Sequence, residues 1–512
     1  MAMTMSGTRL TALTGAPEQR EVFAFLADKR THGQRDTVAR IDTHGAVVFL
    51  AGPDVYKVKR AVRFPFMDFS TLERRRAACA AEIEVNRESA PGLYLGVVPI
   101  TRDGAALRLG GGGEIVEWAV HMRRFDETTT LDRLAANGKL GAALVDRLAI
   151  VVADLHRRAP PRDGAPATGS LRRVLTDTVD ELGQTGLFPQ TGRFGAALAA
   201  AFDAAAPLLE RRAAAGQVRR CHGDLHLGNL ALIDGVPVPF DAIEFDEAFA
   251  TSDILYDLAF LLMDLCERGL RADANRLLNR YLAASDDARL QIEGLAALPA
   301  CMSLRAAIRA KIMAAQHRPE AAQTYFVAAA RFLEAVPPRL VAVGGLSGTG
   351  KSTLAAALAP QLGRPPGAVH LRSDVERKRR FAVTETTALP AAAYRPEVTA
   401  EVYARLYDLA GEALRAGQAA VVDAVFQRAD ERAAIEAVAA DPGVGFAGLW
   451  LEAPLAVLQQ RVSERRGDAS DATAEVVAAQ AARDSGAVAW HRLDAGRPTE
   501  AMVADARGVL GG

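Results

Sequence analysis

Residues 345–352, with the sequence GLSGTGKS, have the composition and spacing of a loop that binds phosphate groups. Glycines let the backbone wrap closely, so that consecutive N–H groups can point at phosphate oxygens. Lys351 is expected to reach the β and γ phosphates of ATP, and the Ser352 hydroxyl to be a ligand of Mg²⁺. The apolar run LVAVGG predicts a buried strand before the loop, and STLAAALA, which begins at Ser352, predicts a helix after it. A strand, a glycine-rich turn and a helix in this order are the context that the motif requires.

Every fixed position of the P-loop pattern GxxxxGK[ST] is occupied in this octet. Residues 339–512 resemble the P-loop kinases that act on small molecules and nucleotides, a group that includes gluconate-kinase-like and polynucleotide-kinase-like domains. The residues expected to contact the nucleotide are Gly345, Ser347, Gly348, Thr349, Gly350, Lys351, Ser352 and Thr353.

The charged segment HLRSDVERKRR lies after the next predicted strand, where such kinases place an acceptor loop. The resemblance implies that Asp374 orients or deprotonates the acceptor hydroxyl and that Arg377 holds the substrate. The alternative is a solvated, charged helix start in which Ser373 or Asp374 is the N-cap.

Three further positions of this domain are assigned through the same resemblance. Asp423 ends the apolar strand AVVD, and it could hold Mg²⁺ through water. Arg428 follows this strand and is expected to contact the substrate. The segment QQRVSERRGDASDA resembles the lid of these kinases, in which Arg465 is expected to stabilise charge on the transferred phosphoryl group.

A second motif, CHGDLHLGN, lies in the other half of the chain. It is similar to the HGDxxxxN loop of aminoglycoside-phosphotransferase-like and choline-kinase-like enzymes. The resemblance implies that Asp224 accepts or orients the proton of the attacking hydroxyl and that Asn229 is a ligand of Mg²⁺. It also implies that Asp241, at the end of a β-rich run, binds the metal. Asp253 and Asp257, in SDILYDLAFLL, are expected to cap and brace the loop.

Kinases of this type need a strand lysine that pairs with a helix glutamate. Strand alternation in the sequence VYKVK places Lys57 and Lys59 on one face, and Lys57 is preferred because Val55 then faces adenine. Glu82 is the preferred helix partner, with Glu84 as its competitor. The two lysines and Glu82 are therefore predicted to bind the nucleotide.

Local patterns predict the elements that position these residues. β-rich runs at 47–50 and 55–62, separated by the turn sequence AGPD, predict a hairpin. A helix is predicted from residue 70 to about 89, and a strand over 114–122. Beyond about residue 130 the chain is rich in Ala, Leu and Arg and is predicted to be mostly helical.

The fold class that follows is an α+β protein-kinase-like domain, followed by an α/β P-loop domain with a parallel sheet. The proline-containing segment at 336–338 breaks the helical pattern and is the predicted linker. The predicted parts are a flexible leader at 1–20, a kinase-like domain at 21–336 with lobes at about 21–125 and 126–336, and a P-loop domain at 339–512.

Composition excludes several other classes of protein. The net charge of −1 argues against a general nucleic-acid-binding surface. The four cysteines form no CxxC pair, so they predict neither a zinc site nor a disulfide framework. The start lacks the apolar run of a signal peptide, and no apolar stretch is long enough to span a bilayer. The sequence therefore predicts a cytoplasmic protein with no membrane contact and no obligate protein partner.

Taken together, the motifs predict a bifunctional phosphotransferase. Each half would use ATP and Mg²⁺ to phosphorylate a hydroxyl of a small molecule, and the two steps could be sequential. One alternative gives the C-terminal half a nucleic-acid 5′-end as acceptor, because SDVER resembles the acceptor loop of polynucleotide kinases. Another makes one half a nucleotide sensor that regulates the other without turnover.

Overall fold

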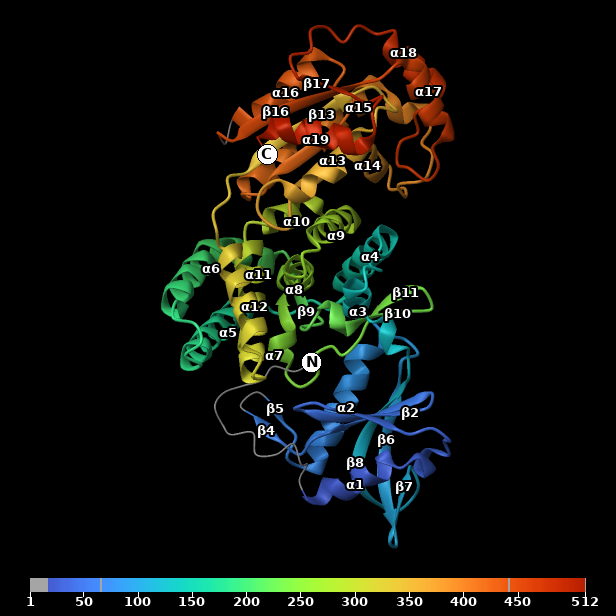
Figure 1. Cartoon of the computed structure of the whole chain (residues 1–512), viewed down its shortest axis with the longest axis vertical. Helices are drawn as coiled ribbons and strands as arrows, with labels where there is room; N and C mark the ends of the chain where they lie inside the picture. The colour runs from blue at the N-terminus through green and yellow to red at the C-terminus, as the bar shows by residue number, and fades with distance from the viewer. Residues whose placement is uncertain (1–16, 65–66, 441–442, 512) are drawn as a thin grey trace. The chain divides into compact units, whose positions relative to one another are not determined.

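The computed structural model of the chain describes residues 17–64, 67–440 and 443–511. Contacts between residues divide it into two compact units. The first unit extends to Glu267 and includes Ala300–Leu333, and the second comprises Arg268–Pro299 and the chain from Glu334 onward. Figure 1 follows this path from blue to red. The chain therefore enters the second unit, returns to the first, and then enters the second again. Most of the predicted leader, residues 1–16, lies outside the described residues.

A six-stranded antiparallel sheet opens the first unit, with the strand order β1-β2-β3-β8-β6-β7. Its strands β2 and β3 form the predicted hairpin, and Gly52 in the turn has the left-handed φ of 61° that favours glycine. The predicted helix at 70–89 and strand at 114–122 are also present, as α2 and β8. The elements are α1 (Pro17–Ala27), β1 (Ala39–Asp42), β2 (Ala46–Ala51), β3 (Asp54–Lys59), β4 (Arg63–Phe64), β5 (Met67–Asp68), α2 (Leu72–Arg87), β6 (Tyr94–Asp103), β7 (Ala106–Leu109) and β8 (Glu114–Arg123).

Helices form most of the rest of the first unit. Helix α8 (Ile254–Glu267) is buried along nearly its whole length, and its two buried acids, Asp257 and Asp264, accept backbone hydrogen bonds from the loop that contains the HGD motif. The other elements are α3 (Leu131–Ala136), α4 (Ala142–Arg158), α5 (Ala165–Gln184), α6 (Thr191–Ala214), β9 (Val218–Arg220), β10 (Leu230–Ile233), β11 (Val236–Pro239), α7 (Glu247–Ala250), β12 (Thr251–Asp253), α11 (Leu298–Ala315) and α12 (Pro319–Phe332). No helix in the described ranges is long and apolar enough to cross a membrane.

The second unit contains the predicted parallel sheet, with the order β14-β15-β13-β16-β17. Its central strand β13 leads directly into the P-loop, and buried aliphatic side chains of β13, β15 and α13 share one hydrophobic core. The elements are β13 (Arg339–Gly345), α13 (Lys351–Leu358), β14 (Val369–Arg372), α14 (Ser373–Arg380), α15 (Pro396–Arg415), β15 (Ala420–Asp423), α16 (Ala429–Ala440), β16 (Gly445–Glu452), α17 (Leu455–Glu464), α18 (Ala474–Ala481), β17 (His491–Asp494) and α19 (Thr499–Leu510).

Two helices from the middle of the chain, α9 (Arg271–Ala284) and α10 (Ala288–Gly294), also belong to the second unit. The sequence-based boundary assigned them to the first domain. Their contacts place them elsewhere because α9 packs on β14, at the edge of the parallel sheet, and α10 packs on α15. The second unit is therefore built from two separate stretches of sequence.

Candidate active sites

A cavity of about 540 Å³ lies in the first unit, between the antiparallel sheet and the HGD loop. Val55 and Met122 from strands β3 and β8 line it, as does Lys57. Asp224 of the HGD loop and Asp241 line the same cavity. Its volume lies in the range of small-molecule sites, roughly 300–1,000 Å³. The structure thus brings together residues that the sequence places far apart.

Both strand lysines pair with the same helix glutamate. Lys57 Nζ lies 2.7 Å from Glu82 Oε1, and Lys59 Nζ lies 2.5 Å from Glu82 Oε2. Lys57 also pairs with Asp241 at 2.6 Å, whereas Lys59 pairs with Glu244. The Glu82 side chain is fully buried, while the competing Glu84 is exposed. The alternation of β3 explains why both lysines point to one side of the sheet.

The charges of this cluster depend on one another. Burial lowers the pKa of Lys57, but the charges of Asp241 and Glu82 outweigh this effect, so its pKa lies well above the ordinary value. Burial raises the pKa of Asp241, yet the Lys57 ammonium contributes to a net pKa below the ordinary range. Lys57 and Asp241 therefore carry opposite charges at neutral pH.

The HGD loop holds its acid beside an amide. Asn229 Nδ2 donates to both the carboxylate and the backbone oxygen of Asp224, each at 2.9 Å. The backbone N–H of Asp241 donates to the Tyr94 hydroxyl at 3.0 Å, and the next N–H donates to Asn86 Oδ1 at 2.9 Å. Tyr94 and Asn86 are functional supports that the sequence did not single out, since neither lies within a motif.

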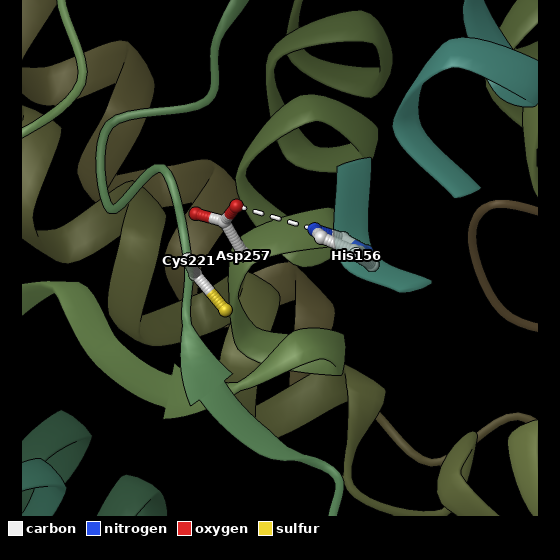
Figure 2. Close-up of side chains that lie close together, drawn as sticks. All are labelled: His156, Cys221 and Asp257. Carbon is white, nitrogen blue, oxygen red and sulfur yellow. Dashed lines mark hydrogen bonds and ion pairs between the residues drawn. The ribbon is translucent and has the colours of Figure 1, made fainter. Parts of the chain in front are cut away.

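A buried cluster behind this loop contains His156, Cys221 and Asp257, close enough together to suggest a metal site (Figure 2). Asp257 already accepts hydrogen bonds from the backbone of His222 at 3.2 Å and Gly223 at 2.9 Å, and it lies 3.2 Å from His156 Nε2. Burial raises the pKa of the Cys221 thiol well above its ordinary value, so the thiolate that binds metals is disfavoured. The cluster braces the HGD loop, as expected for Asp257.

The second predicted brace has a different partner. Arg212 forms a two-pronged ion pair with Asp253, at 2.7 and 2.8 Å, and both side chains are buried. Asp253 also accepts from the backbone N–H of Leu255 at 2.8 Å, which satisfies a donor in the first turn of α8. Asp253 therefore fixes the start of the helix that carries Asp257.

The glycines of the P-loop in the second unit have positive φ values, which residues with side chains rarely adopt. Gly345, Gly348 and Gly350 have φ values of 133°, 87° and 85°. A side chain at Gly345 would lie 2.5 Å from the Leu451 carbonyl oxygen, so close packing also requires glycine there. Helix α13 begins at Lys351, whose Nζ donates to the carbonyl of Leu346 within the loop at 2.9 Å.

The predicted metal-site residues of this unit are adjacent. Ser352 Oγ donates to Asp423 Oδ1 at 3.1 Å, and His370 Nε2 lies 2.6 Å from Asp423 Oδ2. Burial raises the pKa of Asp423, but His370 and nearby cations outweigh this effect, so the net pKa is below the ordinary value. A hydroxyl beside a carboxylate provides the hard oxygen ligands that Mg²⁺ prefers. His370 was not assigned a role from sequence, although it lies in the quoted segment HLRSDVERKRR.

Asp374 lies in the first turn of α14 and is partly buried. Burial raises its pKa, although the nearby Lys351 acts in the opposite direction. The charge of Asp423 acts with burial and raises the pKa of this carboxyl further. Asp374 is not an exposed helix cap, since Arg372 holds the N-cap position.

The three predicted arginines have different environments. Arg465 pairs with Asp468 at 3.5 Å; burial lowers the pKa of Lys351, and the charge of Arg465 acts in the same direction. Arg377 is buried, donates to the carbonyl of Ala393 at 2.6 Å and stacks over a tyrosine ring, which indicates a structural role. Arg428 is 70% exposed and pairs with Asp430 at 2.5 Å, two residues along the chain. The predicted roles of Arg465, Arg377 and Arg428 at the site stay predictions, and the contacts of Arg377 and Arg428 are to groups of the chain itself.

Both halves of the chain are similar in sequence to known proteins. The model of the phosphotransferase enzyme family matches residues 50–294, and that of an AAA domain matches residues 340–485. Uncharacterized protein Rv2004c of Mycobacterium tuberculosis and uncharacterized protein Mb2027c of Mycobacterium bovis are each 30% identical to the chain over 486 residues, which is 91% of this chain and 94% of theirs. The chain belongs to this family of two-domain, phosphotransferase-like proteins. Its phosphotransferase domain and its P-loop domain are both kinase-like, as predicted.

Two solved structures are similar to parts of the chain. A choline/ethanolamine kinase family protein from Mesorhizobium loti is 16% identical, with a TM-score of 0.38, over 62% of this chain and 95% of its own. A sugar kinase from Janibacter sp. HTCC2649 is 22% identical, with a TM-score of 0.28, over 34% of this chain and 95% of its own.

Proposed function

We propose that this protein is a bifunctional ATP-dependent phosphotransferase, in which each unit transfers the γ-phosphate of ATP to a hydroxyl group of a small molecule. One observation supports the proposal. Each unit separately contains a lysine that could bind phosphate, oxygen atoms that could bind Mg²⁺, and a carboxylate that could orient the acceptor hydroxyl. These residues are Lys57, Asn229, Asp241 and Asp224 in the first unit, and Lys351, Ser352, Asp423 and Asp374 in the second.

In the first unit, Lys57 would bind the nucleotide phosphates from the sheet side of the cavity. The oxygen atoms of Asn229 and Asp241 fit Mg²⁺, which would neutralise charge on those phosphates. Asp224 would orient the acceptor hydroxyl and receive its proton. Its hydrogen bond from Asn229, at 2.9 Å, fixes the carboxylate in the cavity for that task.

In the second unit, the P-loop N–H groups and Lys351 would hold the phosphates, while Ser352 and Asp423 would hold Mg²⁺. Asp374 would orient the acceptor hydroxyl. Its raised pKa supports this role, because a base whose pKa is closer to neutrality exchanges protons more effectively at physiological pH. Arg465 would stabilise the charge that develops on the transferred group.

A polynucleotide acceptor for the second unit has less support. A nucleic-acid strand needs a basic groove beside Asp374. The basic side chains of α14 instead make contacts within the unit: Lys378 pairs with Asp471 at 2.6 Å, and Arg379 donates to backbone carbonyls of residues 282–285. Arg380 pairs with Glu401. Such contacts favour a small acceptor.

The test is a screen of small alcohols and a 5′-hydroxyl oligonucleotide with labelled ATP. It uses the full-length protein and two variants, Asp224→Asn and Lys351→Ala. The proposal expects two sets of labelled products, one lost in each variant. If only one set of products forms and only one variant abolishes it, the unit that carries this substitution performs the turnover. The other unit would then have a sensor role. Labelling of the oligonucleotide alone by the second unit would favour the polynucleotide reading.

A further inference from the structure

The chemistry of the acceptor can be inferred from one wall of the first unit's cavity. Residues 305–318, RAAIRAKIMAAQHR, form the end of α11 and the turn after it, and they contain basic but no acidic residues. Arg305, Arg309 and Arg318 line the cavity that also contains Asp224. Lys311 does not line it and pairs with Glu181 at 3.4 Å. The wall beside the reacting carboxylate is therefore basic.

Arg305 connects this wall to the HGD loop. Its Nη1 donates to the carbonyl of Gly223 at 3.0 Å, and its guanidinium lies 3.8 Å from the ring centroid of Tyr256. The residue is 3% exposed, and its Nη2 makes no hydrogen bond within the described part of the chain, although it lies 3.9 Å from Asp257. Arg305 therefore braces the HGD loop from this wall, and its buried positive charge lies beside the cavity.

Three of the five carboxylates that line the cavity pair with basic residues outside this wall. Asp241 and Glu244 pair with the lysines of β3, and Glu127 lies 3.7 Å from Arg133. The other two are Asp224, in the HGD loop itself, and Asp132, which lies near that loop. A site for a polycationic or quaternary ammonium alcohol would need acidic or aromatic groups where α11 presents arginines, and like charges reject such a ligand.

We infer that the acceptor of the first unit is an alcohol that carries an anionic group, either a phosphate or a carboxylate. This inference rests on the phosphotransfer proposed above for the same site. Arg309 and Arg318 would bind the anionic group, because a guanidinium matches a phosphate or carboxylate with two parallel hydrogen bonds. Ile308, Ile312 and Met313, which also line this wall, would contact the carbon skeleton.

The transfer itself is balanced by groups already named. The acceptor oxygen forms a bond to the γ-phosphorus, and the bond from that phosphorus to the bridging oxygen breaks. ADP leaves with the electron pair of that bond, and the hydroxyl proton passes to Asp224. Arg309 and Arg318 take no part in these bond changes. They are substrate-binding residues, so their loss should act on acceptor affinity.

The test uses the full-length protein with Lys351→Ala, a change that is expected to silence the second unit. Glucose, gluconate, glucose 6-phosphate and glucosamine form one series in which the charge changes while the carbon skeleton is kept. Glycerol, glycerate, glycerol 3-phosphate and 3-amino-1,2-propanediol form a second series. Each compound is titrated by calorimetry with Mg²⁺ and a non-hydrolysable ATP analogue, and transfer is then measured with labelled ATP. We expect an anionic member of a series to bind at least about tenfold more tightly than its neutral and cationic counterparts.

The comparison within each series separates the two anionic groups, since the phosphate and carboxylate members are measured independently. The inference would be overturned if no anionic compound bound more tightly than its neutral counterpart. Transfer to a neutral or cationic member alone would also overturn it, while supporting the proposed kinase activity. Tight binding of an anion without transfer would support the inference and contradict the proposed activity of this unit.

Two variants then test the residues. Arg309→Gln and Arg318→Gln should each raise the KM or Kd for the anionic compound about tenfold or more, with kcat and the KM for ATP nearly unchanged. Arg108→Gln is the matched control, because Arg108 lies on β7 and its side chain is 63% exposed. An increase in the KM for ATP instead of the acceptor would assign these arginines to the nucleotide and overturn the inference.

Discussion

The side-chain oxygen of Asn279 accepts a 2.7 Å hydrogen bond from the backbone N–H of His370. Asn279 Nδ2 also donates to the carbonyl of Ala368 at 3.1 Å, and Asn275 donates to the same carbonyl at 2.9 Å. These amides occupy the open edge of β14, where a further strand would otherwise pair. His370 in turn lies 2.6 Å from Asp423, so α9 supports a residue of the predicted metal site that is distant from it in sequence.

Replacing this amide should destabilise the second unit. We expect Asn279→Ala to lower its free energy of unfolding by about 1–3 kcal/mol, because a buried edge group then loses its hydrogen-bond partner. The measurement is urea unfolding followed by tryptophan fluorescence in a Trp118→Phe background, where the remaining tryptophans, Trp450 and Trp490, both lie in this unit. The exposed Asn137→Ala is the control. Equal midpoints for the two variants would contradict the structural role of α9.

The two lysines of β3 should have different roles, one in stability and the other in nucleotide binding. Lys59 is 3% exposed and pairs with two buried glutamates, so Lys59→Ala should destabilise the first unit by about 3–5 kcal/mol. Lys57 is 16% exposed and contacts Asp241, so Lys57→Ala should mainly weaken nucleotide binding, by about 1.5–3 kcal/mol. Urea unfolding and calorimetric nucleotide titration, both in a Lys351→Ala background, measure the two effects. The reverse pattern would make Lys59 the nucleotide ligand.

The activity of the second unit should depend on pH through Asp374. Burial raises the pKa of this carboxyl, and a base acts only when deprotonated, so transfer should fall as the pH decreases through that raised pKa. The loss should begin at a higher pH than an exposed aspartate would give. Asp374→Asn should lower transfer by about 10²-fold or more and leave nucleotide affinity nearly intact. Rate profiles over pH in an Asp224→Asn background check this, and a collapse of nucleotide affinity would instead identify a metal or folding residue.

Lys351→Ala should remove ATP use by the second unit while the first unit stays active. Loss of a charged contact to phosphate should weaken nucleotide binding by about 1.5–3 kcal/mol, and it should cost more in the transition state. The exposed Lys139→Ala serves as the control. Nucleotide titration and labelled-ATP transfer follow both variants in an Asp224→Asn background. Transfer that persists in Lys351→Ala at the wild-type rate would refute the P-loop assignment.

The acids of the first unit should have separable roles. Asp224→Asn should mainly slow transfer, because Asp224 lies where the acceptor arrives. Asp241→Ala should raise the Mg²⁺ concentration needed for nucleotide binding, because it removes an oxygen ligand and also the partner of Lys57. Calorimetric titrations of Mg²⁺ and nucleotide on both variants, in a Lys351→Ala background, distinguish these effects. Unchanged binding and unchanged transfer in both would contradict the reading of the HGD motif.

The sequence by itself determined the motifs and the class of each half. The P-loop is eight contiguous residues whose glycine conformations and strand-to-helix context are local properties, so GLSGTGKS could be interpreted without coordinates. The HGD loop is similarly local. Strand alternation also predicted that Lys57 and Lys59 share a face, since that follows from backbone geometry alone.

Only the tertiary structure decided which distant groups meet. Helix α9 belongs to the second unit, although it lies between segments of the first unit in the sequence. The reason is that its asparagines form hydrogen bonds with the edge of β14. Asn279 and His370, which form one of these bonds, are 91 residues apart. The pairing of Glu82 with both lysines, the contact of His370 with Asp423 and the arginines of α11 beside Asp224 are likewise long-range. The contacts of Arg377 with the Ala393 carbonyl and of Arg428 with Asp430 could likewise not be predicted from the position of these arginines in the sequence. Contacts of this kind depend on packing of the whole chain, which no local pattern encodes.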